Sequence, residues 1–285
     1  MGRLTRRVAL LALIFSTAGL APLSAQPAPT APAQPGASAA TPVTLAAHRA
    51  AYVLTLQRAR EGGEVSAAQG VMLFEAADAC EGWATHQRLT LNLTTRTGDA
   101  IDTSSDYSTY EAKDGKSLRF SLVQSAQGAV SQRISGEAEL KPDGSGLVRY
   151  VEPEPKEVPL PAGTLLPMMH TARAIEAAEA GKRLLVAPLF DGTSDDGAQD
   201  STTVIAGQEA APQANSFPDL AKLTSARFRI AFFERGANQG GASSPDYEVG
   251  LRYFRNGVAD ELSMDFGDFV VNGKLQKLEL LPKGC

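Results

Sequence analysis

The sequence predicts an all-β domain with one helix, built as a long antiparallel meander. Apolar and polar residues alternate over much of the chain, Asx-Gly dipeptides separate the alternating segments, and a single segment has helical spacing instead. Alternation with a period of two is typical of a strand with one buried face, and Asx-Gly supplies the positive φ angles of tight hairpin turns. An antiparallel sheet with one apolar face must close on itself or pack against another element.

Six segments show the alternation most clearly. Their apolar faces are Leu89, Leu91 and Leu93; Leu118, Phe120 and Leu122; Val130, Ile134, Ala138 and Leu140; Phe228, Ile230 and Phe232; Tyr247, Val249, Leu251 and Tyr253; and Leu262, Met264 and Phe266. Turns are predicted at Asp114-Gly115, Asp143-Gly144, Asn256-Gly257 and Asn272-Gly273. The last two are expected to be consecutive hairpins that lead into the C-terminal segment.

One segment departs from the strand pattern. A helix is predicted from Pro167 to Ala180, because proline is favoured in the first turn and Gly181 is placed to end it. Its apolar stripe consists of Met168, Met169, Ala172, Ile175 and Ala178. A stripe of this kind more often fills a core than forms a binding groove. We therefore expect the helix to cover an open sheet or to plug the mouth of a barrel.

The N-terminal region has the layout of an export signal followed by a tether. Residues 1–25 contain three arginines, an apolar segment and a small-residue cleavage point at Leu23-Ser24-Ala25. Residues 26–44 are rich in Pro and Ala, which predicts a flexible linker, and residues 45–285 are expected to form a single domain. Because residues 1–25 carry no acidic group, their removal changes the formal net charge from −5 to −8. Such an acidic protein is a poor candidate for binding nucleic acid.

The chain has two cysteines, Cys80 and Cys285, and the second is the last residue. An exported protein meets an oxidising compartment, so a disulfide between them is the first expectation. Two free thiols, or an intermolecular bond through Cys285, are the alternatives. The separation of the two cysteines fits neither a redox Cys-x-x-Cys motif nor a zinc site, which favours a structural role.

Residues that could carry chemistry are few and scattered. His48, His86 and His170 are far apart in the sequence, so no metal site is predicted from them. We expect His86 to be solvated on a polar strand face and His170 to pack or cap in the first helical turn. No nucleophile elbow, phosphate-binding loop or metalloprotease motif is present, and no cofactor is expected.

Two acidic patterns have alternative interpretations. Asp102-Thr103-Ser104 and Asp200-Ser201-Thr202 resemble the paired loops of aspartic proteases, but both lack the glycine that normally follows. Aspartate beside a hydroxyl residue also makes ordinary turns. A second group, Asp191, Asp195, Asp196 and Asp200, does not follow calcium-loop spacing, so a solvated loop is predicted.

Several ordered segments resemble one known family. They are Leu45–Leu56 (LAAHRAAYVLTL), Asp78–Leu91 (DACEGWATHQRLTL), Ser105–Phe120 (SDYSTYEAKDGKSLRF), Leu160–Gly192 with LPAGTLLPMMH and PLFDG, and Pro245–Cys285 ending in LPKGC. Together they are similar to the EipB family, envelope integrity protein B of alphaproteobacteria. The chain departs from the family in its long Ala/Pro tether and in Val53, where a more polar residue is expected.

The resemblance implies a periplasmic protein with one disulfide, Cys80 to Cys285, and a β-spiral, that is, an incompletely closed antiparallel β-barrel with an associated helix. It also implies a part in envelope integrity and stress resistance, with a tetratricopeptide-repeat periplasmic protein as an associated partner. It supplies no catalytic residue. The architecture is similar to the open barrels of lipoprotein carriers.

Three functional hypotheses follow. The first is a non-enzymatic, monomeric periplasmic protein that supports the envelope by binding another envelope protein. The second is a carrier of lipid or of a lipidated protein, with the helix as its lid. The third is an aspartate-dependent hydrolase. The first two can be separated by whether Leu89, Leu118, Phe228 and Tyr247 line a cavity or fill one.

Overall fold

The computed structural model describes residues 43–211, 216–235 and 244–285. The predicted export signal, 1–25, and nearly all of the predicted linker, 26–44, therefore lie outside the described residues. The elements are β1 (His48–Ala59), β2 (Val65–Asp78), β3 (Gly82–Thr95), β4 (Ala100–Ala112), β5 (Ser117–Ala126), β6 (Ala129–Leu140), β7 (Gly146–Glu152), β8 (Lys156–Leu160), α1 (Pro167–Glu179), β9 (Leu184–Leu189), β10 (Gln199–Glu209), η1 (Pro218–Leu220), β11 (Ser225–Phe233), β12 (Tyr247–Phe254), β13 (Ala259–Asp265) and β14 (Phe269–Leu280).

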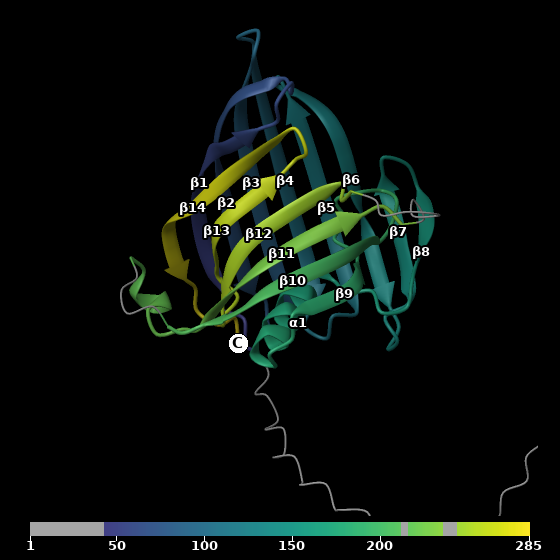
Figure 1. Ribbon diagram of the computed structural model, residues 1–285. Helices are drawn as coiled ribbons and strands as arrows, with labels where there is room; N and C mark the ends of the chain where they lie inside the picture. Colours follow the sequence, from purple (N-terminus) through teal and green to yellow (C-terminus); the bar gives the residue numbers. More distant parts are fainter. Residues whose placement is uncertain (1–42, 212–215, 236–243) are drawn as a thin grey trace, which may run out of the picture. The chain divides into compact units, whose positions relative to one another are not determined.

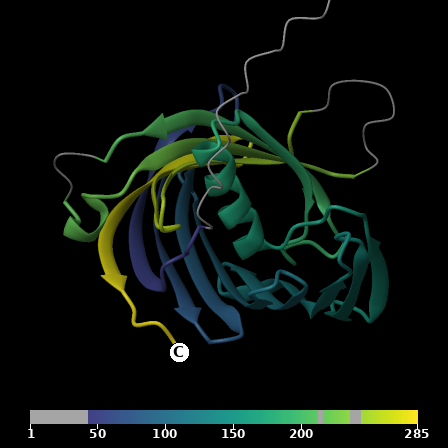
Figure 2. The ribbon, with the colours of Figure 1, turned by 90° about the horizontal axis from the view of Figure 1, so that it is seen from below.

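The strands form one antiparallel sheet in the order β8-β7-β6-β5-β4-β3-β2-β1-β14-β13-β12-β11-β10-β9 (Figure 1). Neighbours in the sheet are neighbours in the chain with one exception, the pairing of β1 with β14. That pairing joins an N-terminal meander, β1 to β8, to a C-terminal meander, β9 to β14. The sheet curves around α1 and is not closed, because β8 and β9 do not pair with each other (Figure 2). The predicted all-β, incompletely closed barrel with one helix is confirmed.

Three of the four predicted turns are correct, and one is wrong. Gly115, Gly144 and Gly257 have positive φ angles in the turns β4–β5, β6–β7 and β12–β13. Asn272-Gly273 instead lies inside β14, and the turn before that strand is made at Gly267, with φ +83°. Glycine occupies position 273 because a Cβ there would lie 2.9 Å from Leu54 Cδ2 and 3.0 Å from Leu262 Cβ.

Helix α1 begins and ends close to where the sequence places it. Pro167 is its first residue, and Gly181, with φ +71°, follows its C-cap. The Lys182 N–H donates to the Ala177 carbonyl (2.9 Å) and the Gly181 N–H to the Ala178 carbonyl (3.0 Å), which is a Schellman ending. The helix packs against β9 and β10 with its alanine-rich face. Within the described part of the chain, no helix is both long and apolar enough to traverse a bilayer.

Two apolar clusters fill the concave side of the sheet. The larger one combines β1, β2, α1 and the strands of the C-terminal meander, and it includes Leu54, Ile175, Phe228 and Phe254. The smaller one lies under β5 to β8. The predicted inward residues mostly belong to these clusters. Val130 is an exception: a register irregularity in β6 turns its side chain outward, and it is 51% exposed.

Candidate functional site

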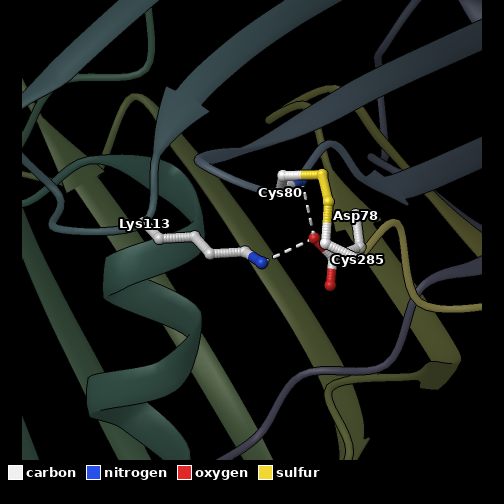
Figure 3. Close-up of a disulfide and its surroundings, with 4 residues drawn as sticks. All are labelled: Asp78, Cys80, Lys113 and Cys285. Atoms are coloured by element: carbon white, nitrogen blue, oxygen red, sulfur yellow. Dashed lines mark hydrogen bonds and ion pairs between the residues drawn. A yellow bond between two sulfur atoms is a disulfide. The ribbon is translucent and has the colours of Figure 1, made fainter.

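The C-terminal segment is fastened to the turn between β2 and β3 by a disulfide. The Cα atoms of Cys80 and Cys285 are 5.4 Å apart (Figure 3). The carboxylate of Asp78 accepts hydrogen bonds from the Cys80 backbone N–H (3.0 Å) and from Lys113 Nζ (2.5 Å). The hydrogen bond from Lys113 holds the pKa of Asp78 below its usual value. Lys113 follows β4, so the disulfide and these hydrogen bonds together join the C-terminal end to the neighbouring strands β2, β3 and β4.

A buried carboxylate holds the beginning of α1. Glu111, from β4, is 1% exposed, and its two oxygens accept hydrogen bonds from the backbone N–H groups of Met168 (2.7 Å) and Met169 (2.9 Å). These N–H groups have no partner within the helix, and the N-cap residue Leu166 supplies no side-chain cap. Burial raises the pKa of Glu111 to about 7. Strand β4 thus supplies the helix cap from a distant part of the sequence and fixes where α1 lies.

The loop between β9 and β10 reaches into the concave side of the N-terminal meander. The hydroxyl of Tyr107 donates to the carbonyl of Asp191. The Tyr150 hydroxyl donates to the Ser194 carbonyl (3.0 Å) and accepts from the Gly197 N–H (3.0 Å). Two tyrosines on β4 and β7 therefore satisfy backbone groups of a loop that would otherwise be desolvated.

The same loop contributes the centre of the smaller apolar cluster. Phe190 is fully buried, and its ring lies edge-on to Phe120 (centroids 5.4 Å apart) and to Tyr150 (6.4 Å). At Gly192, where φ is +74°, a Cβ would lie 2.5 Å from Phe120 Cγ. The chain can pass this close to the aromatic ring only because a glycine stands there. The loop is therefore built into the interior.

The prediction of a solvated loop for the four aspartates is wrong for two of them: burial raises the pKa of Asp191, and Asp200 lies on strand β10. Asp191 Oδ1 accepts hydrogen bonds from the N–H and hydroxyl of Thr193, and Asp195 pairs with Lys156 at 2.6 Å. Among the residues that the structure describes, no group of three or more His, Cys, Asp or Glu side chains is arranged to hold a metal ion.

The interior positions that separate a carrier from a scaffold are mostly packed. Leu118 is fully buried in the smaller cluster, and Phe228 is buried in the larger one. Leu89 and Tyr247 are half-buried and pack against the larger cluster. Leu118 and Phe228 are thus core residues, whereas Leu89 and Tyr247 contact the core and stay partly exposed.

A polar pocket of about 420 Å³ lies at the rim of the sheet, between the β1–β2 turn, the β13–β14 turn and the start of β12. Charged residues line it, among them Arg58, Glu61, Asp246 and Asp265. Arg58 and Asp265 form an ion pair at 3.4 Å. A lining of this kind is unsuited to an acyl chain, which needs a mostly apolar wall.

The three histidines lie apart and have separate structural partners. His48 is buried and its Nδ1 bonds a backbone carbonyl (2.8 Å), whereas His86 is exposed beside Asp106 (3.1 Å). His170 is buried in α1 and bonds the hydroxyl of Thr203 on β10 (3.1 Å). Burial lowers its pKa to about 4, so it is neutral near pH 7.

The two aspartate triplets are not brought together. Asp102 is on β4, where its carboxylate accepts a hydrogen bond from Asn92 Nδ2 (2.6 Å), and Asp200 is on β10, where it pairs with Arg235. Seven strands lie between β4 and β10 in the sheet order. A shared-proton aspartate pair requires the two carboxylates in direct contact. The protease arrangement is therefore not formed by these residues.

Sequence reasoning missed Glu111, Tyr107 and Tyr150, the side chains that tie α1 and the loop to the sheet. Glu111 and Tyr107 lie on β4, which has no apolar alternation, so nothing marked one of its faces as buried. A usable signal is the apolar β5 directly after them: an antiparallel neighbour of a buried strand shares its concave face.

These features define an open, disulfide-braced β-barrel-like protein whose helix and β9–β10 loop pack against the inner side of the sheet. The chain belongs to the EipB-like family, whose model matches residues 39–282. It is 33% identical over 252 residues to "Cell envelope integrity protein EipB" of Brucella abortus (strain 2308), covering 87% of this chain and 89% of that protein. It is also similar to a crystal structure of a beta-barrel-like protein of a domain of unknown function from Brucella abortus, with a TM-score of 0.75, 31% identity, and coverage of 84% of this chain and 100% of the other.

Proposed function

We propose that this protein is a non-enzymatic periplasmic scaffold that supports the integrity of the cell envelope by docking another envelope protein. Membership of the EipB-like family supports the role in the envelope. The observation that carries the scaffold role is the filled concave side, because Phe190, Phe228 and α1 occupy the volume that a cargo would need. The outer surface and the sheet edges are then what remains for binding.

A lipid or lipoprotein carrier is the alternative that the packing disfavours. A carrier would need α1 to act as a lid, but α1 is fixed at its start by Glu111 and along its length by buried contacts with β9 and β10. Opening it would break the two hydrogen bonds from the first turn of α1 to Glu111 and would expose the buried apolar face of the helix, both of which are unfavourable. We expect the docked partner to be a periplasmic protein, with a tetratricopeptide-repeat protein as the first candidate.

The test combines composition and phenotype. Native mass spectrometry of the protein purified gently from its own envelope should show the bare chain, and a bound lipid of defined mass would overturn the scaffold proposal in favour of the carrier. Cross-linking in intact cells should give one reproducible envelope-protein partner. Cells lacking the protein should become sensitive to detergent, and an Asp102→Asn variant should restore resistance fully. If the wild type restored detergent resistance and Asp102→Asn did not, the hydrolase hypothesis would be supported again.

A further inference from the structure

The two free edges of the sheet differ in how they are protected. Strand β8 lies in the segment PEPKEVPLP, and its edge carries lysine, glutamate and several prolines, the residues that natural proteins use to block pairing with another strand. Its Lys156 is also paired with Asp195 of the β9–β10 loop. Strand β9 has the sequence LLVAPL and contains no charge. It has one proline, Pro188, near its end, so the β9 edge is less protected against strand addition than the β8 edge, and Leu184 to Val186 have neither charge nor proline.

The hydrogen-bond pattern shows which groups of β9 are free. The Ile205 N–H donates to the Arg183 carbonyl (3.0 Å), and β10 continues antiparallel along β9 in register Thr203↔Leu185. Since hydrogen-bonded and non-bonded pairs alternate in an antiparallel ladder, Leu184 and Val186 direct their N–H and C=O groups away from β10. No backbone hydrogen bond on that side is formed by either residue within the described part of the chain.

The end of the same edge already accepts an extended segment. Leu165 forms a short parallel bridge with Leu189: its N–H donates to the Pro188 carbonyl (2.9 Å), and its carbonyl accepts from the Phe190 N–H (3.0 Å). Addition of a strand to this edge is thus geometrically allowed, and the bridge stops short of Leu184 and Val186.

The outward side chains beside these free backbone groups are apolar, and a lysine precedes them in the chain. Leu184 is 51% exposed and Val186 63%, and Val204, 49% exposed, lies opposite Leu184 on β10. Lys182 lies two residues before Leu184, directly before the strand begins. It is exposed, its backbone position is set by the Schellman ending of α1, and it has no ion-pair partner among the described residues.

We propose that the free edge of β9 binds an extended segment of a partner protein as an additional antiparallel strand. The complementary segment has two apolar residues facing outward beside Val186 and Leu184, followed two positions later by an acidic residue beside Lys182. Backbone hydrogen bonds give such an interaction its affinity, and the alternate side chains give it specificity. This inference rests on the proposed scaffold function and assigns that function its docking surface.

A short probe peptide tests the proposal directly. We would use fluorescent Gly-Thr-Val-Thr-Val-Thr-Asp-Gly with the full mature protein and follow fluorescence polarisation. Binding is expected below about 1 mM, and Val186→Pro should weaken it at least about tenfold, because proline removes a free N–H without breaking the β9–β10 ladder. Pro188, two residues further along, already occupies the same orientation in this strand. A photo-crosslinking version of the peptide should label the chain at Leu184 to Val186.

Matched controls separate edge binding from general stickiness. Val186→Lys should reduce binding, whereas Val53→Lys, which places the same charge at an outward valine on a central strand, should not. Lys182→Glu should weaken binding of the probe peptide. Replacing the aspartate of the peptide with lysine should restore binding to that variant. A peptide methylated on the two nitrogens that face β9 should not bind. Melting curves of each variant confirm that it is folded.

Two results would overturn the inference: no saturable binding up to about 1 mM, or equal affinity for the wild type, Val186→Pro and Val186→Lys. The scaffold proposal is judged separately, by restoring detergent resistance to cells that lack the protein. If Val186→Pro restores resistance and keeps the cross-linked partner, the docking edge is wrong while the scaffold stands. If even the wild type acquires no partner in the envelope, the scaffold proposal itself fails.

Discussion

Replacing Cys285 with serine opens a covalent loop whose ends are 205 residues apart. In the chain-entropy model, closing a loop of that length stabilises the folded state by about 5 kcal/mol, and measured values are commonly smaller. We therefore expect the free energy of unfolding to fall by about 2–5 kcal/mol. For a domain of about 240 residues this corresponds to a Tm lowered by about 4–10 °C. The fold itself should persist, because most of the sheet is paired through local hairpins.

The assay is urea unfolding of the wild type and of Cys285→Ser, followed by tryptophan fluorescence. The wild type measured in a reducing agent is the matched control, and it should fall to the stability of the variant, which should not respond to the reductant. Cys80→Ser and the double variant should match Cys285→Ser. Equal unfolding free energies for the oxidised wild type and the variant would refute the reasoning. The disulfide would then contribute no measurable stability by restricting the unfolded chain.

Three further changes test the interior. Glu111, with a pKa of about 7 against an ordinary 4.5, is protonated in the folded protein and ionised in the unfolded chain between these values. The contribution of Glu111 to the free energy of unfolding therefore falls by about 3 kcal/mol as the pH rises from about 4.5 to about 7. Glu111→Gln should remove this pH dependence from unfolding free energies measured across the same range. Phe190→Ala should destabilise by about 3–5 kcal/mol in urea unfolding, because the site is fully enclosed. Gly273→Ala should lower stability by about 1–3 kcal/mol in the same assay, because Leu54 and Leu262 leave no space for a methyl group, and unchanged stability would show that they move aside freely.

Local patterns predicted those parts of the fold that local chemistry decides. The alternation at Leu118, Phe120 and Leu122 marked a buried strand face, and Asp114-Gly115 marked the turn before it. Asn272-Gly273 failed because glycine serves two purposes, positive φ in a turn and close approach in a strand. Only the neighbouring side chains, which the local sequence does not reveal, distinguish them.

The interior contacts escaped prediction because they join elements that are distant in sequence. Glu111 stands just before an exposed turn, so its surroundings in the sequence suggest a solvated residue, and its burial follows from α1 arriving above it. The order of the strands was equally hidden. Nothing in β8 or β9 alone shows that these two consecutive strands form the opposite edges of one sheet.

That strand order explains where the disulfide acts. The β1–β14 pairing is the one ladder in the sheet between strands from opposite ends of the described chain, so it bears the largest loop-closure entropy. The disulfide lies next to it: Cys285 follows β14, and Cys80 follows β2, the other neighbour of β1. In Cys285→Ser, amide hydrogen exchange should therefore speed up in β1 and β14 before it does in the local hairpin of β5 and β6. An equal loss of protection in both places would show that the bridge stabilises the whole sheet and not this junction. Preferential loss at the junction would mean that the bridge holds two locally folded meanders together as a single sheet.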